Sequence, residues 1–242
     1  MGKGKRKIRS VVLALALIPL MSGAALGMIF WSGPTQMEMA HMKVMLNHGL
    51  IMILDGSNLA MVGEIDRSDE IDEASRKMAL DLMEKGKTTV THILSGEDMM
   101  KLHEGGHKDD PMMKTTHELG EYILKIADLS DKMSKSMSMS DKESEMHHMH
   151  IMLNHAMKHA AGGWNVMALG RMGMGAEMDE YSEMHGRNMI KDARALIVQT
   201  SDSKAMKDMH SMGMSPEDDS TMKQMHHLIE LYLKLIDFLS RN

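Results

Sequence analysis

The sequence predicts an all-α protein: an N-terminal transmembrane helix followed by two tandem-duplicated antiparallel helical bundle units of three to four helices each. Three observations lead to this fold class. An apolar stretch near the N-terminus is long enough to cross a bilayer. After it, apolar residues recur every three to four positions, and no segment shows the alternation that is typical of strands. Finally, the second half of the chain repeats the first at offsets of 106 to 109 residues.

The N-terminal segment, residues 1–35, is a basic arm followed by the uncharged stretch Val11–Trp31. These 21 residues can span a bilayer, and Trp31 stands where an interfacial aromatic residue is expected. Because basic arms stay in the cytoplasm, we expect a single-pass cytoplasmic-membrane protein whose soluble part lies in the periplasm or outside the cell. The alternative is a signal peptide that is cleaved near Gly23-Ala24-Ala25, which would give a secreted protein.

The duplication is clearest in HMKVMLNHGL at 41–50 and HMHIMLNHAM at 148–157. Further matches follow in the same order, with small drifts in the offset, so one unit of about a hundred residues has been copied. We place the first unit at 36–137 and the second at 138–242, with a linker rich in Ser, Lys, Met and Asp at Ser134–Ser144.

Each copy is predicted to contain the same helices in the same order. The apolar pattern places a first helix at 36–65 and 145–172, a second at 69–94 and 179–200, a short helical turn at 97–104 and 203–210, and a last helix at 112–132 and 218–240. Pro111 and Pro216 stand just ahead of the last helix, where proline favours a helix start. Two arrangements stay open: two separate bundles, or one bundle with pseudo-twofold symmetry.

Small residues recur every seven positions along the first helix of each copy. They are Gly49, Gly56 and Gly63 in the first copy and Ala156, Gly163 and Gly170 in the second. Glycine inside a helix costs about 1 kcal/mol, so this stripe indicates that another helix approaches closely there. We expect the two copies to meet along it.

Methionine dominates the apolar composition, with 34 residues against 2 Trp, 2 Phe and no Cys. The lack of cysteine excludes disulfides, zinc knuckles, iron–sulfur clusters and thiol nucleophiles. Methionine packs well in irregular helical cores, and this accounts for many of the residues. It accounts less well for methionines that alternate with histidine or occur in polar runs such as MSKSMSMS at 133–140.

The charge distribution bears on the kind of partner. The formal net charge is −6, but five of the first ten residues are basic, so the remainder has 23 basic and 34 acidic residues, a net charge of −11. An acidic body argues against nucleic acid as a partner and is compatible with binding cations.

The strongest candidate ligands lie on the first helix of each copy. Helical spacing puts four of them on one face in the second copy (His148, Met152, His155 and His159) and three in the first (His41, Met45 and His48), where Met52 replaces the fourth. His107 and Met214 are exchanged in the same way between the copies. Imidazole and thioether both suit copper, whereas methionine is a poor zinc ligand, so we expect a copper ion as cofactor.

Two further histidines, His117 and His226, match each other at the start of the last helix and are weaker candidate metal ligands. The string HEGGH at 103–107 fits the zinc-protease motif, but Gly105-Gly106 disfavours the continuous helix that this motif needs. Its counterpart HSMGM at 210–214 also lacks the glutamate base, so we do not expect a protease.

A redox centre is a weaker alternative. Glu145 and His148 fit the Glu-x-x-His spacing of di-iron bundles, and haem bound by His and Met is conceivable, although haem pockets are usually richer in aromatic residues. No phosphate-binding glycine loop or catalytic Ser-His-Asp pattern is present, so we expect no enzymatic activity.

The sequence therefore favours a membrane-anchored, exported Met/His-rich protein that buffers or delivers copper in the periplasm. The main alternative is a helical interaction or scaffold domain without metal, tethered to the membrane and bound to a helical protein partner or to a second copy of itself.

Overall fold

A computed structural model describes residues 36–62, 69–96, 99, 110–136, 141–173, 175–211 and 220–241. The helices are α1 (Gln36–Val62), α2 (Asp69–Ser95), α4 (Pro111–Ser136), α5 (Asp141–Arg171), α6 (Ala176–Ser201), α7 (Lys204–Ser211) and α8 (Ser220–Arg241). These ranges contain no strand, so the all-α prediction is confirmed. None of the described helices combines the length and apolar character needed to cross a bilayer. The predicted anchor, Val11–Trp31, lies outside the described residues.

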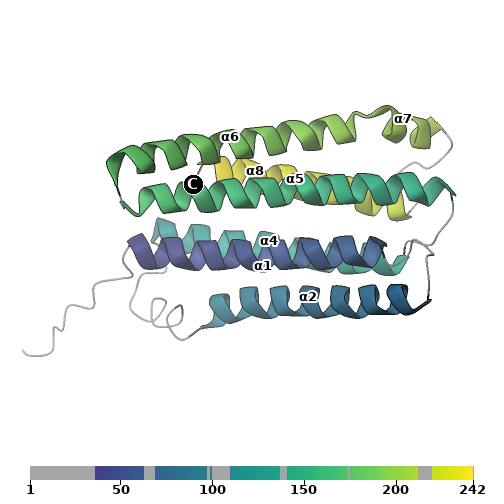
Figure 1. The fold of residues 1–242 in the computed structure, drawn as a ribbon, viewed down its shortest axis with the longest axis horizontal. Coiled ribbons are helices and arrows are strands. Elements are labelled where there is room, and N and C mark those ends of the chain that lie inside the picture. Colours follow the sequence, from purple (N-terminus) through teal and green to yellow (C-terminus); the bar gives the residue numbers. More distant parts are fainter. Residues whose placement is uncertain are drawn as a thin grey trace, which may run out of the picture. The chain divides into compact units, whose positions relative to one another are not determined.

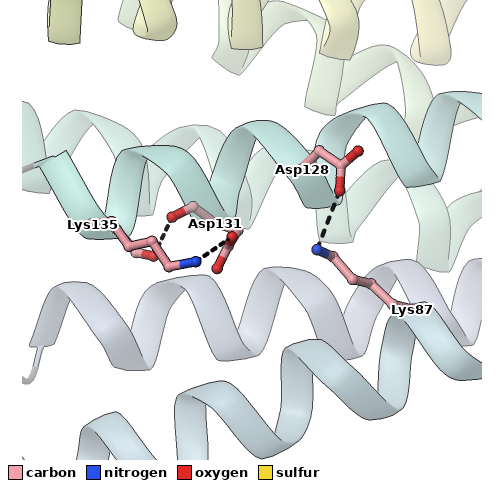
Figure 2. Close-up of polar contacts among 5 residues, drawn as sticks. Lys87, Asp128, Asp131 and Lys135 are labelled. Carbon is pink, nitrogen blue, oxygen red and sulfur yellow. Dashed lines mark hydrogen bonds and ion pairs between the residues drawn. The ribbon is translucent and has the colours of Figure 1, made fainter.

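The predicted linker between the copies is shorter than expected, because α4 continues to Ser136 and α5 begins at Asp141. Two local interactions support the last turn of α4. Lys135 pairs with Asp131 one turn earlier at 2.7 Å, and the Ser134 hydroxyl donates to the Asp131 carbonyl (Figure 2). The two ends of the predicted linker, Ser134–Ser136 and Asp141–Ser144, therefore belong to helices.

Four helices form the centre of the bundle. α1 and α8 each pack against both α4 and α5, while α2 lies against α1 and α4, and α6 against α5 and α8. Figure 1 shows the resulting layers: α6, then α5 with α8, then α1 with α4, then α2. The helices of each copy thus occupy matching places on the two sides of the contact between copies.

One hydrophobic core runs through both copies. It includes Leu46 and Ile53 of α1, Ile126 of α4, Leu153 of α5 and Leu235 of α8. Of the two arrangements that the sequence left open, this shared core is that of one pseudo-twofold bundle. Many methionines are part of the buried interior, which confirms the core role for them: Met39, Met61, Met83, Met99, Met113, Met133, Met146, Met149, Met157, Met167, Met206, Met209, Met222 and Met225.

The small-residue stripe brings helices together within each copy. A Cβ atom built on Gly56 would lie 2.7 Å from the Ala79 carbonyl oxygen of α2, and one on Gly163 would lie 2.7 Å from the Gly186 carbonyl oxygen of α6. The predicted close approach is confirmed, but the expectation that the copies meet there was wrong. The stripe faces the next helix of the same copy, because helices joined by a short connection pack along most of their length.

Besides the shared core, polar residues of α1 and α5 join the copies. Asn47 Nδ2 donates to Asn165 Oδ1 at 3.1 Å, and Asn154 Nδ2 donates to Asn58 Oδ1 at 2.8 Å. Each asparagine of one pair is the repeat equivalent, 107 residues away, of an asparagine in the other pair. Later residues of α1 pair with earlier residues of α5, so the two helices are antiparallel and related by a pseudo-twofold axis.

Equivalent ion pairs join the outer helices to the centre. Lys87 of α2 lies 3.2 Å from Asp128 of α4 (Figure 2), and Arg194 of α6 lies 3.1 Å from Asp237 of α8. All four side chains are at least partly exposed, so each pair contributes at most about 1 kcal/mol.

Candidate metal centre

The predicted ligands of the second copy lie on the solvent-facing side of α5. His148 and His155 are exposed, Met152 is 43% exposed and His159 is half-buried. The opposite side of α5 contributes Leu153, Ala156 and other residues to the core. The helical register thus places the four side chains on one face, as the spacing predicts.

The first copy presents the equivalent face of α1. His41 and His48 are exposed, while Met45 and Met52 are half-buried. The same register relative to the core produces this second stripe, since α1 and α5 are related by the pseudo-twofold axis.

These stripes have limited ligand density. Within the described ranges, no three side chains of the His, Asp or Glu type are grouped closely enough to hold a metal ion. The spacing of His155 and His159, one turn apart, is the spacing at which two imidazoles of one helix can reach one ion. Met152 is the thioether one turn before His155.

A charged pair lies beside the α5 stripe. Lys158, next to His159 in the sequence, pairs with Asp55 of α1 across the contact between the copies. Asp55 therefore offsets the positive charge that Lys158 would otherwise place beside the candidate ligands.

His117 and His226 occupy different surroundings. His117 is half-buried on α4 and lines a shallow groove with Glu118, Glu121 and Tyr122. His226 of α8 meets His210 of α7, and their Nε2 atoms are 3.0 Å apart. His210 is not among the predicted ligands, although it aligns with His103 at an offset of 107, and this match was a usable signal. His103 lies outside the described residues.

Two other histidines of the same stretch, His147 and His150, are in the interior, with 2% and 0% of their surface exposed. His150 Nε2 and the Ser57 hydroxyl form a hydrogen bond of 2.7 Å between α5 and α1. Burial, and then the nearby His147, lower the pKa of His150 to about 3, so this imidazole is neutral at physiological pH. His150 falls on the helix face opposite the candidate stripe and His147 on the flank between the two faces, so the spacing indicated a core position for His150.

The structure describes the Glu-x-x-His pairs of the di-iron alternative but not the HEGGH string. Glu145 and His148 are exposed, as are their counterparts Glu38 and His41, whereas a di-iron centre needs such residues directed into the bundle. The HEGGH string at 103–107 lies outside the described residues, as does Met214.

Comparison of the chain with protein-family models, with curated proteins and with solved structures finds no match.

Proposed function

We propose that this chain is a membrane-anchored, exported protein that binds copper through the His/Met stripes of α1 and α5 and buffers or delivers it in the periplasm. One observation carries the proposal. Two helices related by the duplication each present alternating histidine and methionine to solvent, while many other methionines are buried.

The position of Met152 supports a ligand role. Methionine side chains gain about 1.5–3 kcal/mol from full burial, and the bundle buries many of them. Met152 is 43% exposed, as are other methionines outside the stripes such as Met178 at 63%, and its position between His148 and His155 is what distinguishes it. An exposed thioether between two imidazoles offers the soft and borderline ligands that copper prefers.

The preferred ion follows from the ligand type. Thioether sulfur favours Cu(I), imidazole binds both copper oxidation states, and no thiolate is present that oxidation could remove. The segment Val11–Trp31 would anchor the chain in the cytoplasmic membrane, with the stripes in the part outside the cytoplasm.

Titration of the full-length chain with Cu(I), under anaerobic conditions and against a chromophoric Cu(I) chelator, tests the proposal. Replacement of His148, His155 and His159 by alanine should weaken Cu(I) binding roughly tenfold or more, because it leaves only thioethers on the α5 stripe. His185→Ala is the matched control, since His185 is exposed on α6 outside both stripes.

Unchanged Cu(I) affinity in the triple variant would reject the α5 stripe as a copper site. Zn(II) binding as tight as Cu(I) binding would reject the preference for copper. If the wild-type chain binds neither ion more tightly than micromolar, the scaffold interpretation replaces the copper one. Far-UV circular dichroism of each variant confirms that the helices are intact.

A further inference from the structure

Away from both stripes, His210 of α7 and His226 of α8 form a close pair. Their Nε2 atoms are 3.0 Å apart, their ring centres are 5.1 Å apart, and their ring planes differ by 14°. His210 is exposed and His226 is half-buried.

These three values define the relative orientation of the rings. Each imidazole nitrogen lies about 1.1 Å from its ring centre, so a centre separation of 5.1 Å is close to the maximum that a 3.0 Å nitrogen separation allows. The two Nε2 atoms therefore lie between the rings, near the line that joins the centres. The rings are nearly coplanar and end to end, and one Nε2–H donates to the lone pair of the other Nε2.

The geometry points to a two-coordinate Cu(I) site in which the metal ion takes the place of the shared hydrogen between His210 and His226. Two-coordinate Cu(I) places its ligands on opposite sides, and the two Nε2 atoms of this pair already face each other along one line. With metal–nitrogen bonds of about 2.0 Å, the Nε2 atoms must separate from 3.0 Å to about 4.0 Å. A tetrahedral zinc ion would instead need both rings to turn toward a common point.

The required movement of about 1 Å can come from α7. This helix has eight residues, follows the short turn at Asp202 and Ser203, and buries Met206 and Met209. His210 lies near its last turn and is exposed, whereas His226 belongs to the long, well-buried α8. Rotation of the exposed His210 side chain can therefore supply the movement while Met206 and Met209 stay in the core.

Metal binding changes which ring nitrogens of His210 and His226 hold hydrogen. In a neutral pair the donor ring moves its hydrogen from Nε2 to its own Nδ1 through water, so both rings bind as neutral ligands and no proton is released. If the pair holds an additional proton, one proton is released to solvent for each ion bound.

Burial and the nearby His210 lower the pKa of His226, and Glu230 opposes both effects. The site rests on its own geometry, independent of the stripes proposed above, with which it shares no residue.

The test uses the full-length chain with ¹⁵N-labelled histidine and Ag(I), a redox-inert ion with the same linear preference, followed by anaerobic Cu(I). We expect the Nε2 signals of His210 and His226 to shift together as one equivalent of Ag(I) is added. His210→Ala and His226→Ala should each remove this response and weaken binding at this site by about tenfold or more. His227→Ala, at the adjacent exposed position of α8, should leave it unchanged.

Two results would overturn the site: separate responses of the two rings at different Ag(I) ratios, or an unchanged response in His210→Ala. His210 is exposed, so this variant tests the site even if His226→Ala fails to fold. The His155→Ala/His159→Ala variant separates the two proposals, because it removes stripe ligands and should leave the paired signal of His210 and His226 intact.

Discussion

Asn47 and Asn154 occupy equivalent positions in the two copies, yet only the Oδ1 atom of Asn154 accepts a hydrogen bond from a described residue. Both donate through Nδ2 across the pseudo-twofold axis. Asn154 Oδ1 also accepts a hydrogen bond from the Tyr232 hydroxyl at 2.5 Å. Among the described residues, the buried Asn47 Oδ1 has no hydrogen-bond partner, and Ile123 is the repeat equivalent of Tyr232.

The difference shows that both copies keep the asparagine contact, whereas among the described residues only the second copy has a hydroxyl that hydrogen-bonds the asparagine oxygen. A buried acceptor without a partner costs about 1–3 kcal/mol. The second copy avoids this cost through one aromatic hydroxyl, so the polar contact around Asn154 should be the more stable half of the interface.

The largest expected effect is a difference in the free energy of unfolding between variants of these two asparagines. Asn154→Leu leaves the Tyr232 hydroxyl and Asn58 without their partner and should lower the free energy of unfolding by about 2–4 kcal/mol. Asn47→Leu removes an acceptor that is already unsatisfied and should cost about 1 kcal/mol. Urea unfolding of both variants measures the difference, and equal losses would contradict the proposed asymmetry.

The second effect concerns another equivalent pair, Lys43 and His150. Lys43 lies over the Trp164 ring at 5.9 Å, whereas His150 bonds Ser57, the repeat equivalent of Trp164. The pKa of His150 is about 3 in the folded state, against 6.5 ordinarily. As the pH falls from 6.5 toward 3, the unfolded state binds a proton that the folded state does not, so stability falls.

Between pH 6.5 and pH 4.5 this contribution amounts to a loss of about 2–3 kcal/mol, which His150→Asn should remove from the pH dependence. Urea unfolding at several pH values, with a chelator present, gives the slope of the free energy of unfolding against pH. His148→Ala, at an exposed position of the same helix, should keep the wild-type slope. Identical slopes for wild type and His150→Asn would show that His150 is protonated in the folded state.

The smallest effect tests a feature that the copies share. Gly56→Ala and Gly163→Ala should each cost about 1–3 kcal/mol, because the added Cβ atom meets backbone oxygen at 2.7 Å. Gly162→Ala should instead stabilise the protein by about 0.5–1 kcal/mol, since its nearest new neighbour would be Met189 Cε at 3.6 Å. Thermal unfolding checks the signs, and stabilisation by Gly163→Ala would mean that α5 and α6 are not in close contact there.

The helices and the exposed faces of α1 and α5 could be predicted because helical periodicity is a local property. A residue's place on its helix follows from its spacing, which puts His148 and His155 on one side and His150 on the other. Their burial follows once the core side is known, and the apolar residues Leu153 and Ala156 identify that side.

The identity of the neighbouring helix does not follow from helical spacing. A stripe of small residues indicates a close approach, but spacing within one helix does not tell whether Gly163 faces its own copy or the other. The contact of His210 with His226 likewise depends on how the short helix α7 packs against α8.

By itself, the sequence determined an all-α chain, duplicated, with histidine and methionine exposed on two equivalent helices. Only the tertiary structure decided that the copies share one core, that they meet through asparagine pairs, and that His210 and His226 lie end to end. The physical reason is that periodicity acts over one or two helical turns, whereas contacts between helices depend on how all the side chains between them pack.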